Sequence, residues 1–219
     1  NRMLAQHRRA GKSPGPHPGS AFENRVFVYK QKDGTMQDYI MGPYDQTIQT
    51  ANFPILTSLV GLAFGGNSPF QAEIYFINLS GNIQIRFGVP YFDVYDPRFS
   101  DFYVPMSARG TLTLNITDYQ TFIKNNRLIN FEIEDFHKTI KDALAKYIKG
   151  VVSNIPADKQ IPVVQMDKKL LEINDIVAAY LKPRLENEFG VNMKGFDLAT
   201  LEIDKESEGY RELRKVTAE

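Results

Sequence analysis

The chain has 219 residues, of which 42% are hydrophobic and 24% charged, a composition that suits one globular domain with appendages. Its 26 basic and 26 acidic residues give a formal net charge of zero, so no overall field favours nucleic acid as a partner. Because the chain holds no cysteine, a disulfide scaffold, a thiol nucleophile and a cysteine-ligated zinc site are excluded.

Residues 1–24 are rich in proline, glycine and serine and contain few apolar side chains. Such a segment buries too little surface to offset the entropy lost on ordering, so we expect a disordered arm. Its basic side chains all precede the first acid, Glu23. Two interpretations stay open: a basic arm that attracts anionic lipid, or a leader or natural linker.

An antiparallel hairpin is predicted after the arm. Residues 26–29 are β-branched and aromatic, Asp33-Gly34 is a strong turn signal, and residues 36–41 form the return strand. A second turn at Gly42-Pro43 leads into residues 44–50.

The segment 52–66, with the sequence NFPILTSLVGLAFGG, is apolar but interrupted by proline and glycine. It is too short for a transmembrane helix, which needs about 20 apolar residues, and predicts an irregular excursion. Its apolar side chains either lie under the sheet or are partly exposed as a membrane or partner contact. In the second case the contact surface consists of Phe53, Leu56, Leu59, Val60, Leu62 and Phe64.

Two further strands are predicted at 71–79 and 82–87, joined as a hairpin by Ser80-Gly81. The next segment, 91–101, holds three aspartates and is expected to be a loop, because Asp96-Pro97 favours a turn.

The most regular pattern in the chain runs from Phe102 to Thr117. Apolar or small residues occupy every second position, and the positions between them are mostly polar. Successive side chains of a strand point to opposite faces, so this stretch predicts a long strand or a bent strand pair with one buried and one solvated face, kinked or bulged at Gly110. An antiparallel sheet tolerates such a solvated face, whereas a parallel sheet covered on both sides does not. The predicted fold class is therefore α+β, with a mainly antiparallel, twisted sheet and helices packed on one face.

Helical spacing replaces the strand pattern after Thr117. Thr117 and Gln120 have the spacing of a capping box, which opens a short helix. Asn130 is expected to cap a second helix that ends near Gly150 and is followed by a loop between Pro156 and Pro162. The apolar stripe expected to face the sheet comprises Ile133, Phe136, Ile140, Leu144, Tyr147, Ile148 and Val151.

A third helix is predicted from about Asp167 to Phe189, with a kink or break at Pro183 and a left-handed cap at Gly190. A strand follows over 191–204, with an irregularity at Gly195. Residues 205–219 then read as the start of a longer C-terminal helix, whose apolar contacts for self-association are Tyr210, Leu213 and Val216.

The search for chemistry favours a protein without an active site. The chain has no P-loop, no G-x-G-x-x-G and no G-x-S-x-G motif. His137 is the one histidine of the folded part and is expected to be a helix-surface residue, because no second histidine can join it. We therefore expect no catalytic residues, no cofactor, no metal and no nucleic-acid partner.

Three passages resemble the SPFH (band 7, prohibitin-homology) superfamily. They are Gly42-Pro43-Tyr44, residues 50–56 (TANFPIL) and residues 64–76 (FGGNSPFQAEIYF), and they are most similar to the bacterial branch labelled "virion core protein-like". Residues 181–185 (LKPRL), Phe189-Gly190-Val191 and the strand end Leu201-Glu202-Ile203 resemble the closing helix and strand of that domain.

The resemblance implies a domain over residues 25–204 followed by the start of a coiled-coil-like helix over 205–219. It also implies a non-enzymatic scaffold that homo-oligomerises at or near the cytoplasmic face of a membrane, peripheral to it, and that organises membrane or stress-response proteins. The alternative is a ligand-binding or hydrolytic α+β domain that uses the loop region 52–69.

Overall fold

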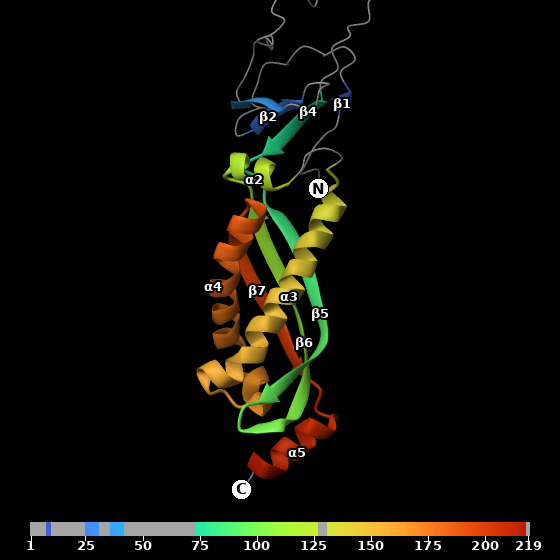
Figure 1. Ribbon diagram of the computed structural model, residues 1–219, viewed down its shortest axis with the longest axis vertical. Coiled ribbons are helices and arrows are strands. Elements are labelled where there is room, and N and C mark those ends of the chain that lie inside the picture. The colour runs from blue at the N-terminus through green and yellow to red at the C-terminus, as the bar shows by residue number, and fades with distance from the viewer. Residues whose placement is uncertain (1–7, 10–24, 31–35, 42–72, 127–130, 218–219) are drawn as a thin grey trace, which may run out of the picture. The chain divides into compact units, whose positions relative to one another are not determined.

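The computed structural model describes Arg8–Arg9 and residues 25–30, 36–41, 73–126 and 131–217 (Figure 1). The chain divides into two compact units, Asn1–Gly81 and Asn82–Glu219.

The first unit contains a four-stranded sheet with the strand order β1-β4-β2-β3, in which each described pair is antiparallel. The predicted first hairpin is confirmed, because β2 pairs with β3. The apolar excursion 52–66 and the predicted strand 44–50 lie outside the described residues. The strands are β1 Arg8–Arg9, β2 Arg25–Lys30, β3 Met36–Met41 and β4 Glu73–Asn78.

The second unit is built on a three-stranded antiparallel sheet with the order β5-β6-β7. Its strands are β5 Ile83–Asp96, β6 Phe99–Asn115 and β7 Asn192–Ile203. The alternation predicted for the central strand is confirmed, because its apolar positions are fully buried at Val104, Met106, Ala108, Leu112 and Leu114. The predicted α+β class is confirmed as well.

The second predicted hairpin is wrong. β4 and β5 flank Ser80-Gly81 as expected, but they belong to different sheets. The side-chain Oδ1 of Asn78 accepts a hydrogen bond from the backbone N–H of Ser80 at 3.1 Å, which stabilises the bend directly after β4.

The predicted loop 91–101 is also wrong, because β5 continues to Asp96 and pairs with β6 across most of this segment. The predicted turn itself is confirmed, because the chain turns at Pro97-Arg98 and β6 begins at Phe99. Three aspartates suggested a loop, but Asp93 and Asp101 are exposed, and only Asp96 is buried.

Two long helices cover one face of the second sheet (Figure 1). α3 packs along β5, α4 packs along β7, and the two helices contact each other. The fully buried stripe of α3 includes Ile140, Leu144 and Ile148, as the helical spacing predicted. The helices are α2 Tyr119–Asn125, α3 Ile133–Lys159, the 3-10 helix η1 Val163–Lys169, α4 Leu170–Phe189 and α5 Glu208–Thr217.

Several predicted helix ends differ from the structure. α2 begins after Asp118, whose side chain accepts from the N–H of Thr121 at 3.0 Å, so Asp118 and not Thr117 caps the helix. α3 passes through Gly150 and Pro156 to Lys159, because Ile155 and Pro156 are buried and their packing offsets the lost backbone bond.

α4 is likewise one continuous helix through Pro183, which lies on its exposed side. Asp167, the expected cap, lies in η1 instead. The left-handed cap is confirmed, since Gly190 has φ 64° and a side chain there would meet the backbone of Phe122.

A side chain of α4 covers part of the outer edge of the sheet. Oδ1 of Asn174 accepts a hydrogen bond from the backbone N–H of Leu198 in β7 at 2.8 Å. β7 carries an extra residue at this point, because Gly110 pairs with Leu198 whereas Arg109 pairs with Thr200. The amide that points away from the sheet therefore has its partner within the chain.

A buried carboxylate fixes the turn between β5 and β6. Asp96, 1% exposed, accepts hydrogen bonds from the backbone N–H, Nε and Nη2 of Arg98 at 2.9–3.0 Å, and from the backbone of Val163 in η1. Burial alone would raise the pKa of Asp96, but the hydrogen bonds from Arg98 and Val163 outweigh burial and lower it. Asp96 thus ties the strand turn to the helical layer.

Replacing Asp96 with asparagine should lower the free energy of unfolding at pH 7 by about 1–3 kcal/mol, because a charged acceptor of several hydrogen bonds is lost. A carboxyl whose pKa is lowered on folding stabilises the protein above its unfolded pKa of about 3.9, and this contribution disappears as the pH falls further. In urea titrations the wild type and Asp96→Asn should therefore converge as the pH falls from 5 towards 3, and a constant difference would contradict this role.

Gly110 lies beneath an aromatic pair. The rings of Phe87 and Phe196 are stacked at 5.6 Å with an interplanar angle of 7°. A Cβ atom on Gly110 would lie 2.6 Å from Cζ of Phe87 and would also meet the carbonyl oxygen of Asp197. The irregularity predicted at Gly110 is confirmed, although the inserted residue is in β7.

Gly110→Ala should lower the free energy of unfolding by about 1–3 kcal/mol, because backbone oxygen and a packed ring must both move. The matched control is Gly88→Ala in β5, where an added Cβ meets nothing within 4 Å. Equal urea midpoints for the two variants would contradict the close approach at Gly110.

Candidate interaction surface on the open sheet face

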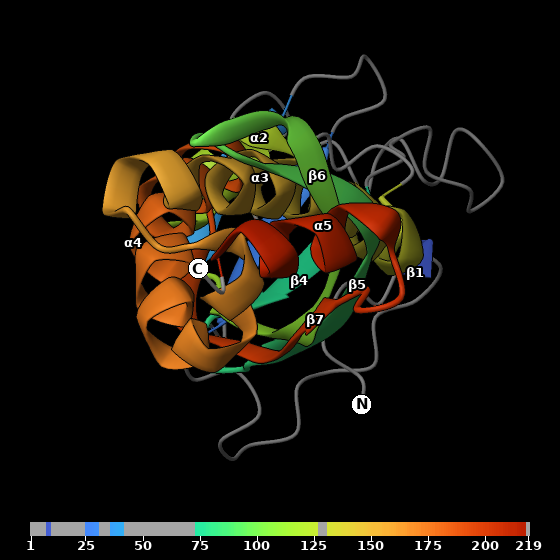
Figure 2. The ribbon, with the colours of Figure 1, turned by 90° about the horizontal axis from the view of Figure 1, so that it is seen from below.

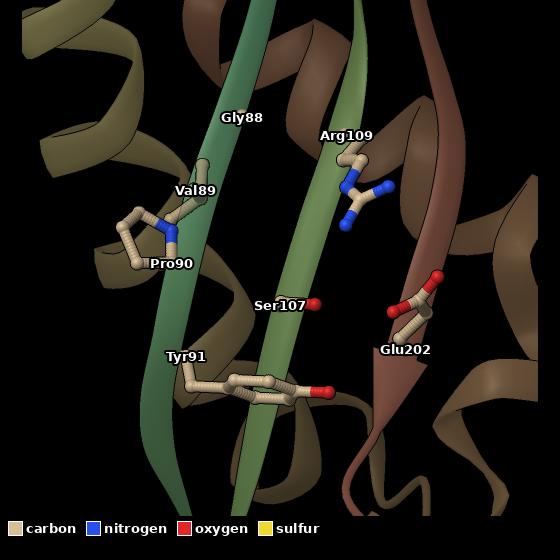
Figure 3. Close-up of a pocket in the computed structure, with 7 residues that line it drawn as sticks. All are labelled: Gly88, Val89, Pro90, Tyr91, Ser107, Arg109 and Glu202. Carbon is tan, nitrogen blue, oxygen red and sulfur yellow. The ribbon is translucent and has the colours of Figure 1, made fainter.

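The second sheet has one face without a helix among the described residues of its unit. Figure 3 views this face, with the helices behind the strands and the labelled polar side chains in front. The side chains that alternate with the buried ones point here, so the solvated register predicted for β6 is confirmed at Tyr103 and Arg109. We call this surface the open face. Its members include Arg86, Tyr91, Tyr95, Tyr103, Ser107, Arg109, Thr111, Asp197 and Glu202.

An extra residue in β5 shapes the centre of the open face. Val89 pairs with Ala108 and Phe92 pairs with Met106, so Pro90 and Tyr91 together lie opposite the single residue Ser107. Both Pro90 and Tyr91 are exposed as a result.

A shallow cavity of about 330 Å³ lies beside this bulge. In Figure 3 the ring of Tyr91 lies at one end, Arg109 at the other, and the Ser107 side chain between them points towards the strand that carries Glu202. The full lining is Gly88, Val89, Pro90, Tyr91, Ser107, Arg109 and Glu202.

The polar groups of this cavity are unused within the described part of the chain. No ion pair joins Arg109 or Glu202 to another described residue, although they lie on adjacent strands. Ser107 is 8% exposed, and its hydroxyl has no hydrogen-bond partner among the described residues. The cavity therefore offers a cation, an anion and a hydroxyl to an external group.

Exposed aromatic side chains continue the open face towards the turn of β5 and β6. Tyr91, Tyr95 and Tyr103 are 58%, 52% and 45% exposed, and the rings of Tyr95 and Tyr103 lie 5.6 Å apart. Tyrosine beside arginine is the composition that protein interfaces favour. Together the cavity and the tyrosines indicate a surface for another macromolecule.

The site residues expected from the sequence lie elsewhere. Phe53, Leu56, Leu59, Val60, Leu62 and Phe64 fall outside the described residues, as does the loop region 52–69 of the alternative hypothesis. Tyr210, Leu213 and Val216 lie on α5, which crosses the end of β6 (Figure 2). Leu213 is fully buried within the chain, Tyr210 is half-buried and Val216 is 42% exposed.

The structure also places His137, which the sequence suggested to be at the surface, in a half-buried position on α3. Its Nε2 is buried and has no hydrogen-bond partner among the described residues. Burial lowers the pKa of His137, with the positive charge of Lys141 acting in the same direction.

The described residues hold no group of three or more His, Cys, Asp or Glu side chains arranged to bind a metal. Within the same part of the chain, none of the helices combines the length and the apolar character needed to span a bilayer.

The open face could be predicted from the sequence, because polar residues at every second position of β6 mark one face of that strand. The cavity could not be predicted, because it depends on the bulge at Pro90-Tyr91. The alternation of apolar and polar residues predicted for this strand ends at Phe87, before the bulge.

The profile described as SPFH domain-Band 7 family matches residues 21–218. No curated protein matches the chain.

Proposed function

Because the chain belongs to the SPFH domain-Band 7 family, we propose that it is a non-enzymatic scaffold that homo-oligomerises at or near the cytoplasmic face of a membrane. The match over residues 21–218 is the observation that carries this proposal, since members of the family are generally non-enzymatic scaffolds. In this role the protein organises membrane or stress-response partners and belongs to the bacterial virion core protein-like branch.

Membrane association is the second part of the proposal. SPFH domains are membrane-associated, which supports a peripheral position for this chain. We propose that the apolar segment 52–66 makes the contact, with Leu59 and Leu62 at its centre, because its composition combines large apolar side chains with interruptions.

Self-association is the third part. α5 is held to the domain by Leu213, while Val216 stays exposed on the same helix. We propose that Tyr210 and Val216 remain available as contacts for a neighbouring copy, whereas Leu213 acts mainly by fixing the helix.

The oligomeric state tests the scaffold directly. Sedimentation velocity of the full chain at about 1–50 μM should show species heavier than the 24.9 kDa monomer, with a fraction that rises with concentration. A monomer over the whole range would refute a homo-oligomeric scaffold.

Flotation with vesicles of phosphatidylcholine and phosphatidylglycerol tests the membrane contact. Changing Leu59 and Leu62 together to serine should reduce partitioning by at least about tenfold, because two leucine side chains no longer transfer from water to lipid. The matched control is Leu171→Ser on α4, an exposed leucine outside this segment. Equal flotation of the double variant and the control would reject a membrane role for this segment.

A further inference from the structure

We infer that two copies of this chain pair through the open faces of their three-stranded sheets, so that β7 of each copy lies opposite β6 of the other. This inference rests on the proposed self-association and names the surface that it uses.

Charged groups in two rows of the open face differ in sign between the strands, although Asp93 on β5 is also acidic. In the central rows of the face the basic groups, Arg86 and Arg109, lie on β5 and β6, whereas the acidic groups, Asp197 and Glu202, lie on β7. The register places Arg86 and Asp197 in one row, on either side of Thr111. No ion pair among the described residues uses any of these four side chains.

This separation makes the surface complementary to itself. Across a two-fold axis the same patch of each copy is in contact, so a basic group of one copy must lie opposite an acidic group of the other. An axis parallel to the strands and between β6 and β7 satisfies this condition for Arg109, because it places Arg109 of each copy opposite β7 of the other. β5 with Arg86 then lies outside the overlap of the two sheets.

A uniformly charged partner fits less well. Asp93, which lies opposite Pro105, adds a further acidic group, so the face carries side chains of both signs. Nucleic acid or an anionic membrane would meet repulsion from Asp197 and Glu202 wherever it met attraction from Arg86 and Arg109.

The cavity provides the contact that fixes the register. Glu202 and the free hydroxyl of Ser107 face a volume of about 330 Å³, which accommodates a guanidinium group. Arg109 of the second copy fills it, with its nitrogens donating to the carboxylate of Glu202 and to the hydroxyl oxygen of Ser107. The exposed rings of Tyr91, Tyr95 and Tyr103 supply apolar area around this contact.

Charge reversal tests the pairing. In sedimentation velocity of the full chain, Arg109→Glu and Glu202→Arg should each weaken association by at least about tenfold, because each places like charges opposite each other. The matched control, Lys182→Glu on the exposed side of α4, reverses a charge away from the face and should assemble as the wild type does.

Mixing provides the decisive measurement. In an equimolar mixture of the two variants, the glutamate introduced in one copy meets the arginine introduced in the other, and the unchanged Arg109 and Glu202 meet at the second, symmetry-related contact. Association should therefore return to within a few-fold of the wild type. Thermal melts of each variant should match the wild type, which separates lost contacts from lost folding.

The outcomes distinguish the two proposals. If the wild type assembles and both variants assemble equally well, the face is wrong and the scaffold stands; a monomeric wild type overturns both. If the variants fail alone and also in the mixture, the reciprocal pairing is wrong. If Arg109→Glu keeps its mass but no longer floats with vesicles, the face contacts lipid and the inference is wrong.

Discussion

The difference between the two faces of β6 determines the architecture of the second unit. Its apolar register is buried against α3 and α4, and its other register meets solvent. Burial of about 25 cal/mol per Å² of apolar surface drives the two helices onto one side only, because the other side offers them little apolar area. The uncovered side is therefore a consequence of the packing, and the polar groups gathered there are the groups that a neighbour can use.

Much of this organisation could be predicted from the sequence, because the strongest signals are periodic. The alternation around Leu112 and Leu114 fixes a strand and its buried face, and the stripe around Ile140 and Leu144 fixes the helix that covers it. Gly190 ends α4 as expected, since few other residues adopt its positive φ. These features are determined by residues that are close together in the sequence.

The errors arose where distant contacts outweighed local preference. Pro156 stays within α3 because the surrounding side chains are buried against the rest of the unit, which the local proline rule does not include. Aspartate next to proline favours a turn, yet Asp96 accepts hydrogen bonds from Arg98 and from the backbone of the more distant Val163 and is buried. Similarly, Ser80-Gly81 has the composition of a hairpin turn, and only the pairing of β4 with β2 shows that it joins separate sheets.

The hydrogen bond between Asn174 and the amide of Leu198 limits how such sheets can grow. An edge strand with free amides is a template for adding another strand, and that process leads to open-ended fibres. The backbone N–H of Leu198 already donates its hydrogen bond to a side chain of the same molecule. Addition of a further strand through this point of β7 is thereby disfavoured.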